Sequence, residues 1–195
     1  MTTARPLIPG LAAIAFYAAY VFHLTRLRRA ENILWACHVG CLLVGIGWLA
    51  RWPLANAIGL LWSLPGVFLW ILYLAGGGKL TWPSLLTHVG GAALGLWGAA
   101  VFSFPEGAWW KAGIGYVLLV VFSRRVSRAQ ENVNFSIGVW PGWERHFPSH
   151  GRHLVFLLLG AFALFLALEE LLRHFLPPAA GIFHALFPPG QDHRL

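Results

Sequence analysis

The sequence predicts an all-α fold, a polytopic bundle of about six transmembrane helices, from its composition and from the length of its apolar stretches. Of the 195 residues, 58% are hydrophobic and only 11% are charged. Soluble domains carry roughly 25% charged residues, and about 20 consecutive apolar residues are enough to cross a bilayer. We therefore predict an integral membrane protein with a single transmembrane domain over residues 1–195.

Six apolar stretches follow one another along the chain. They cover residues 7–24, 33–50, 54–75, 84–104, 107–123 and 153–176. The first stretch lacks a strongly basic leader and a small-residue cleavage site, so we expect it to be retained as a span. The proline-rich segment 177–195 has one short apolar piece, residues 179–187. It is too short to span, and we expect an interfacial or flexible tail.

Basic residues gather in the loops that follow the first, third and fifth stretches. They are Arg26, Arg28, Arg29, Lys79, Arg124, Arg125, Arg128, Arg145 and Arg152. Cytoplasmic loops are enriched in lysine and arginine, so the pattern predicts an inner (plasma) membrane protein with both termini outside the cytoplasm. Most of the net charge of +7 would then meet anionic headgroups. These residues flank spans, and no nucleic-acid partner is expected.

Three predicted spans share a histidine followed by a glycine seven residues later. The pairs are His38 and Gly45, His88 and Gly95, and His153 and Gly160. Ionisable side chains are costly to place inside a membrane and are candidates for function. If the chain forms three helical hairpins, all three histidines lie at the cytoplasmic ends of helices, about 7–8 Å inside for His38 and His88 at the helical rise per residue. We favour chance similarity between glycine-rich spans over a true internal repeat as the origin of the shared spacing.

Three kinds of chemistry fit these residues. A thiol, Cys37 or Cys41, is a nucleophile if an imidazole such as His88 stabilises its thiolate; both cysteines also suit a role as small apolar fillers. A metal would be held by His38, His88 and His153, or by the loop trio His146, His150 and His153. A haem b would sit between His38 and His88. Outside these alternatives, no cofactor is expected.

The order of residues along the chain also resembles that of a known family. The matching segments are Leu34–His38, Leu60–Gly66, Ser84–His88 and Asn132–Phe135. They resemble the YwaF-type family of integral membrane proteins, whose animal members are regarded as acyltransferases of ether phospholipids. The resemblance implies Cys37 as nucleophile or acyl acceptor, His88 as its base and Asn134 as a polar companion. We also count His38, the neighbour of Cys37 in the chain, among the candidate catalytic residues.

The expected function is therefore a lipid-modifying membrane enzyme that performs acyl transfer or hydrolysis on a phospholipid near the cytoplasmic face. Its partners would be a membrane lipid and an acyl donor. The alternative is a non-enzymatic membrane protein, either a transporter or a subunit of a larger complex, whose histidines bind a metal or haem b.

Overall fold

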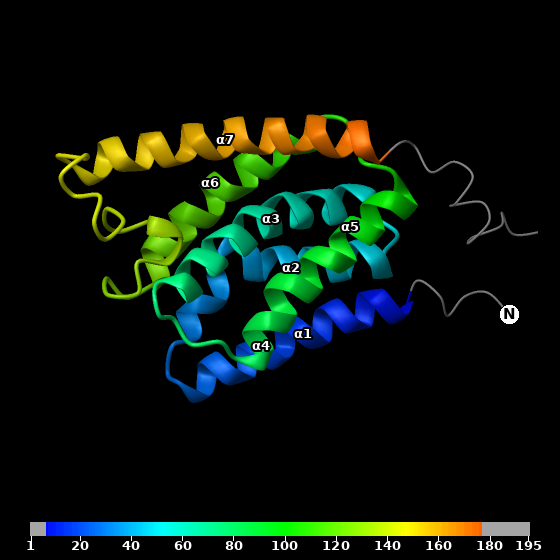
Figure 1. Cartoon of the computed structure of the whole chain (residues 1–195), viewed down its shortest axis with the longest axis horizontal. Helices are drawn as coiled ribbons and strands as arrows, with labels where there is room; N and C mark the ends of the chain where they lie inside the picture. The colour runs from blue at the N-terminus through cyan, green and yellow to red at the C-terminus, as the bar shows by residue number, and fades with distance from the viewer. Residues whose placement is uncertain (1–6, 177–195) are drawn as a thin grey trace, which may run out of the picture.

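Helices occupy all six segments that the sequence predicts to span the membrane (Figure 1). The computed structural model describes residues 7–176, so the predicted tail lies outside the described residues. The helices are α1 (Leu7–Arg26), α2 (Ala36–Leu49), α3 (Pro53–Ala75), α4 (Trp82–Leu85), α5 (Gly91–Phe102), α6 (Ala108–Val126) and α7 (His150–Phe175). A π-helical turn, η2 (Leu86–Gly90), joins α4 to α5, and two short 3-10 helices are η1 (Ala30–Leu34) and η3 (Val133–Phe135). The all-α prediction is confirmed.

Four continuous helical segments are long and apolar enough to cross a membrane. They are residues 7–26, 53–75, 82–102 and 150–175. Helix α2 has 14 residues and is about 21 Å long at the helical rise, less than the roughly 30 Å hydrocarbon core of a bilayer. Helix α6 includes Lys111, Arg124 and Arg125 and is not among the four. The chain is therefore a helical membrane protein by composition and helix length.

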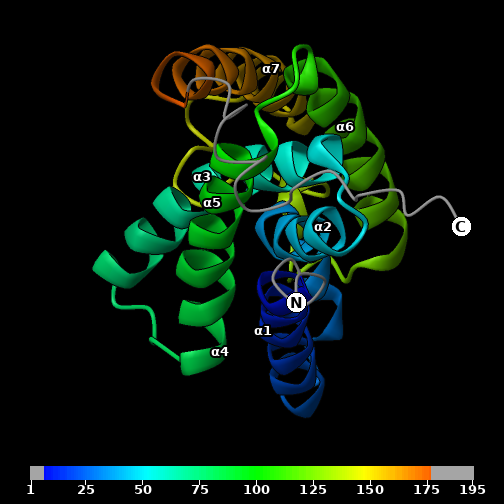
Figure 2. The ribbon, with the colours of Figure 1, turned by 90° about the vertical axis from the view of Figure 1, so that its right-hand side faces the viewer.

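Helix α2 lies at the centre of the bundle and packs against α1, α3 and α5 (Figure 2). Glycines make this close packing possible, because a Cβ on Gly40 would lie 2.7 Å from the carbonyl oxygen of Gly59 on α3. A Cβ on Gly45 would lie 2.7 Å from the side chain of Ile14 on α1. Small residues at such contacts let helix backbones approach closely.

The third glycine of the shared histidine–glycine spacing differs from the other two. A Cβ on Gly160 would meet nothing within 4 Å, whereas a Cβ on Gly95 would contact Val44 and Leu60. Gly45 and Gly95 therefore lie in helix contacts and Gly160 does not. The common spacing does not correspond to three equivalent packing positions.

The loops after α1, α3 and α6 lie together at one end of the bundle, on the left of Figure 1. Residues 27–35, 76–81 and 127–149 form this end. We call it the basic end because most of the lysine and arginine residues lie in these loops or at the helix ends that adjoin them. The long loop between α6 and α7 is attached there to the segment before α2. Arg29 forms an ion pair of 2.6 Å with Glu131, and Arg128 pairs with Glu31.

At the opposite end, α7 holds the start of α6. Glu169 on α7 is buried, and its two carboxylate oxygens accept hydrogen bonds of 2.7 Å from the backbone N–H groups of Gly107 and Trp109. The first N–H groups of a helix have no partner within the helix. For α6, the carboxylate of Glu169 on α7 supplies the missing hydrogen-bond acceptors.

Candidate functional site: a buried cysteine and two histidines

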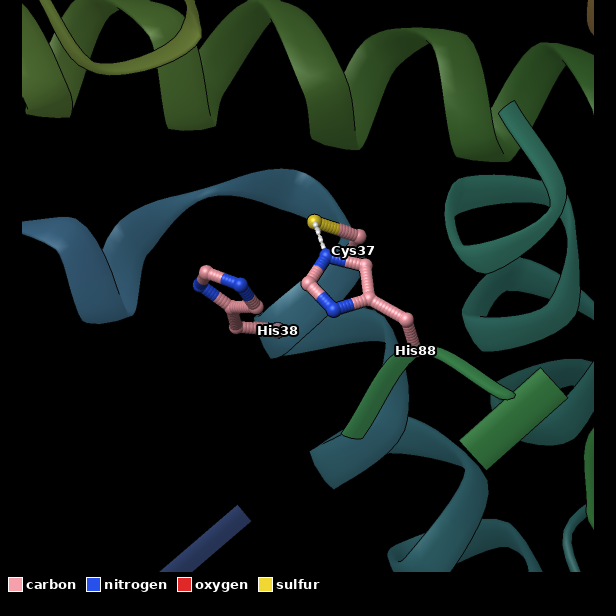
Figure 3. Close-up of side chains that lie close together, drawn as sticks. All are labelled: Cys37, His38 and His88. Atoms are coloured by element: carbon pink, nitrogen blue, oxygen red, sulfur yellow. Dashed lines mark hydrogen bonds between the residues drawn. The ribbon is translucent and has the colours of Figure 1, made fainter. Parts of the chain in front are cut away.

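Cys37, His38 and His88 meet in one buried group, which we call the Cys–His cluster (Figure 3). Their ligand atoms all lie within 4.8 Å of one another. The exposed fractions are 8% for Cys37, 4% for His38 and 5% for His88. Cys37 and His38 come from the first turn of α2 and His88 from the π-helical turn, near the basic end.

Cys37 and His88 form a thiol–imidazole pair. The Sγ atom of Cys37 lies 3.4 Å from Nε2 of His88, and Nδ1 of His88 lies 2.8 Å from the backbone carbonyl oxygen of Ser84. A carbonyl oxygen can only accept, so Nδ1 of a neutral His88 carries the proton and Nε2 presents its lone pair. The thiol therefore donates to Nε2, the arrangement of a nucleophile beside its base.

His38 is held in the same way. Its Nδ1 lies 2.8 Å from the backbone carbonyl oxygen of Asn32, which again assigns the proton to Nδ1 and leaves Nε2 without one. The His38 and His88 rings meet edge to face, with centroids 5.1 Å apart and planes at 80°. Each ring is thus oriented by a backbone group of the turn before it.

The local backbone around His88 is unusual, because the residue lies within a π-helical turn. Such turns are rare in proteins, and those that do occur are often at functional sites. The hydroxyl of Thr87, beside it, donates to the carbonyl oxygen of Pro83 at 2.8 Å. Ser84, which orients the imidazole, follows directly after Pro83, and its backbone N–H is capped by the hydroxyl of Thr81.

Two aromatic side chains enclose the cluster. Trp70 of α3 stacks on His88, with ring centroids 5.3 Å apart and planes at 11°. The indole N–H of Trp70 is buried and finds no hydrogen-bond partner within residues 7–176. Tyr20 of α1 packs against His38 with a centroid separation of 4.4 Å. Sequence reasoning missed both residues, since aromatic side chains are common in apolar helices and carry no local signal of a site.

Asn134 lies beside the cluster as a helix cap. Its Oδ1 accepts from the N–H of Ala36 at 2.9 Å, and its Nδ2 donates to the Leu34 carbonyl at 2.8 Å and to the Ser123 hydroxyl at 3.0 Å. Ala36 is the first residue of α2 and precedes Cys37. The amide of Asn134 is therefore fully engaged at the start of α2. Asn134 positions the helix turn that carries Cys37 and His38.

His153 does not join the cluster. It is 2% exposed at the start of α7, where its ring packs edge to face against Phe147 at 5.1 Å and Phe135 at 6.2 Å. Among residues 7–176, Cys37, His38 and His88 are the only group of three or more potential metal-ligating side chains. The structure therefore does not bring His153 together with His38 and His88, because His153 lies on α7, which packs against α6. The third potential metal ligand beside His38 and His88 is the thiol of Cys37.

The arrangement does not fit a haem b between His38 and His88. Two axial imidazoles lie on opposite faces of the macrocycle and both direct a nitrogen at the iron. Here the rings are in edge-to-face contact, and Nε2 of His88 is directed at the thiol of Cys37. The cluster could instead hold a single metal ion through one sulfur and two nitrogens.

A network of ionic side chains connects the long loop to the cluster. Glu131 accepts hydrogen bonds from the Arg29 guanidinium at 2.6 to 3.1 Å and from the side chain of Asn32. The backbone carbonyl of Asn32 in turn holds His38. Hydrogen bonds from Arg29, then from Asn32, hold the pKa of Glu131 below its ordinary value. The loop thus contributes to the orientation of one imidazole.

Comparison with protein-family models, with curated proteins and with solved structures gave no match.

Proposed function

We propose that the chain is a membrane-embedded enzyme that transfers or hydrolyses the acyl chains of phospholipids, with Cys37 as nucleophile and His88 as general base. The single observation that carries the proposal is the 3.4 Å separation of Sγ and Nε2, together with the Nδ1–H of His88 directed at Ser84. A thiol beside an imidazole whose other nitrogen is held is the usual arrangement of an activated cysteine. The resemblance to a family of lipid acyltransferases points to the same pair.

In the first half of the reaction, Sγ attacks the carbonyl carbon of a lipid ester or acyl thioester while its proton moves to Nε2 of His88. The tetrahedral intermediate collapses with release of the alcohol or thiol, which takes the proton from His88. The product on the protein is a thioester at Cys37. In the second half, the hydroxyl of a lysolipid, or water for hydrolysis, gives its proton to His88 and attacks the thioester. Cys37 leaves and recovers that proton.

The oxyanion of each tetrahedral intermediate needs a hydrogen-bond donor. We assign this role to the indole N–H of Trp70, which lies against the His88 ring and has no partner of its own among the described residues. Asn134 is unsuited to the role because its amide is engaged at the start of α2.

The proposed location follows from the basic end. If residues 27–35, 76–81 and 127–149 face the cytoplasm of the inner (plasma) membrane, both termini lie outside the cytoplasm. The Cys–His cluster is then near the cytoplasmic leaflet, where an acyl thioester or an anionic phospholipid would reach it. Because the thiol is buried, the reaction needs a local opening of the bundle.

Intact-protein mass spectrometry tests the proposal. Detergent-purified protein is incubated with an acyl thioester and then with a lysophospholipid. We expect an adduct of one acyl chain that disappears when the lysophospholipid is added, and that is not formed by Cys37→Ala or His88→Ala.

Cys41→Ala is the matched control. Cys41 lies one turn further along α2, is fully buried, and its thiol donates to the Ala13 carbonyl at 3.4 Å. It should form the adduct like the wild type. Turnover that survives in Cys37→Ala would overturn the proposal.

A further inference from the structure

We infer that the Cys–His cluster is a binding site for a thiophilic divalent cation of the zinc class, held by Sγ of Cys37 and by Nε2 of His38 and of His88. The donor set is the first argument. One thiolate and two imidazoles suit zinc and are poor ligands for magnesium or calcium, which prefer oxygen.

The orientation of both rings is the second argument. Histidines that bind metals almost always donate their other ring N–H to a carboxylate, a backbone carbonyl or water. His38 and His88 both do so, each at 2.8 Å, to the carbonyls of Asn32 and Ser84. Both rings therefore keep an unprotonated Nε2 for the cluster, as metal binding requires.

The spacing is the third argument. With zinc–sulfur and zinc–nitrogen bonds of about 2.3 and 2.0–2.1 Å, tetrahedral geometry separates a sulfur from a nitrogen ligand by about 3.6 Å. The Sγ and Nε2 atoms of Cys37 and His88 are 3.4 Å apart. All three ligand atoms lie within 4.8 Å of one another, so adjustments of about an ångström bring them to one centre.

Charge is the fourth argument. The Cys37 thiol is protonated while it donates to Nε2 of His88, and it must lose this proton to solvent in order to bind a metal. A buried thiolate without a positive partner is costly, and the aromatic neighbours Tyr20 and Trp70 offer no positive charge. A divalent cation would stabilise the thiolate that binding creates. Within residues 7–176 the site has three protein ligands, so a fourth position is left for water or another small ligand, as in catalytic zinc sites.

Metal binding has a consequence for the proposed function. The cation and the acyl-transfer reaction use the same atoms, Sγ of Cys37 and Nε2 of His88, so each excludes the other. We infer that zinc inhibits the enzyme at this site. This second part rests on the proposed function, whereas the binding site itself does not.

Titration with Co²⁺ tests the binding site without any substrate. The metal-free, detergent-purified protein is titrated while absorption is recorded. We expect one equivalent of Co²⁺ to produce a thiolate-to-cobalt charge-transfer band in the near ultraviolet and intense visible bands typical of a tetrahedral site, and Zn²⁺ to remove them. Absence of any bands in the wild type would overturn the inference.

Matched variants assign the ligands. Cys37→Ser should lose the charge-transfer band, and His38→Gln or His88→Gln should weaken Co²⁺ binding at least tenfold. Cys41→Ser and His153→Gln remove a buried thiol and a buried imidazole elsewhere and should bind like the wild type. Circular dichroism and gel filtration verify that each variant is folded. A band that is retained in Cys37→Ser, or lost in Cys41→Ser, would place the metal elsewhere.

Inhibition is measured separately, as the rate of acyl-adduct formation against free Zn²⁺. We expect loss of activity over the concentrations at which Zn²⁺ displaces Co²⁺. If Co²⁺ binds as expected and no adduct forms without metal, the proposed function fails and the metal site stands. If adduct formation is unaffected at saturating Zn²⁺, the inhibitory role is wrong.

Discussion

The two imidazoles of the Cys–His cluster are oriented by backbone carbonyls, so their orientation depends on the fold of the preceding turn. For His88 the carbonyl belongs to Ser84, one turn earlier in the same helical segment. For His38 it belongs to Asn32 in the 3-10 helix before α2. A hydrogen bond to a backbone carbonyl survives substitution of the residue that supplies it. Changes in the backbone of these two turns should therefore affect the site more than changes in their side chains.

Removing the indole N–H of Trp70 tests its assigned role at the residue scale. Trp70→Phe keeps a ring against His88 but removes the donor. We expect kcat for acyl transfer to fall about 10²–10³-fold, the usual effect of losing one oxyanion donor, with KM little changed. Trp62→Phe is the control, since the N–H of Trp62 already donates to the Ala112 carbonyl. Its kcat should be that of the wild type, and an equal loss in both variants would contradict the assignment.

Low pH should weaken the attachment of the long loop. Hydrogen bonds from Arg29 lower the pKa of Glu131, and those from Arg128 lower the pKa of Glu31. A lowered folded-state pKa stabilises the fold above the unfolded-state value of about 4.3, and this stabilisation is lost as pH falls through the folded-state value.

Thermal unfolding in detergent between pH 7 and pH 3 measures the effect. Glu131→Gln should lower the free energy of unfolding at pH 7 by about 1 kcal/mol, and Tm should fall with it. The variant should also show a weaker dependence of Tm on pH below pH 5. Glu144→Gln is the control, because that carboxylate contacts the backbone N–H of Gly142 in its own loop. An unchanged pH profile in Glu131→Gln would exclude this role.

At the scale of elements, helix ends and helix contacts are completed by distant parts of the chain. Asn134 caps α2 from 98 residues away, and Glu169 caps α6 from the last helix. The central helix α2 has only 14 residues and packs closely against its neighbours through glycines. The stability of these helices therefore comes from the bundle and not from each helix alone.

The carboxylate of Glu169 should be important for stability. Glu169→Ala leaves two N–H groups at the start of α6 without their partner, and we expect a loss of about 1–3 kcal/mol. Glu170→Ala, at the exposed neighbouring position, should change stability by less than about 0.5 kcal/mol. Thermal unfolding of the two variants in detergent compares them. Equal stability of both would show that the cap contributes nothing.

Glycine substitutions should distinguish contact positions from open ones. Gly40→Ala would place a Cβ 2.7 Å from a backbone oxygen of α3, so the helices must separate and Tm should fall. Gly160→Ala meets nothing within 4 Å, and alanine favours a helix by about 1 kcal/mol over glycine, so Tm should stay the same or rise. The reverse order of the two Tm values would contradict the packing of α2.

For the whole molecule, the arrangement of the helices gathers the loops after α1, α3 and α6 at the end where the Cys–His cluster lies (Figure 1). Most of the basic residues lie in these loops or at the helix ends that adjoin them. If this end faces the cytoplasm, the C-terminus lies on the other side of the membrane. In a bacterial host, alkaline phosphatase fused after residue 195 should then be active and green fluorescent protein fused there should be dark. The opposite result would reverse the orientation and place the cluster near the outer leaflet.

The sequence by itself determined the fold class and the approximate position of each helix. Hydropathy summed over about 20 residues is a local property, and it decides which segments leave water whatever their partners. The same locality explains why Cys37 and His88 could be singled out, since a thiol and an imidazole inside apolar segments are conspicuous before any fold is known.

The tertiary structure alone decided which of these residues meet. It excluded His153, which has the same spacing to a glycine as His38 and His88, and it assigned Asn134 to the start of α2. The physical reason is that membership of a site depends on how helices rotate and pack against one another. The contacts of Asn134 and of Cys37 join residues 98 and 51 positions apart, and no local pattern in the chain encodes them.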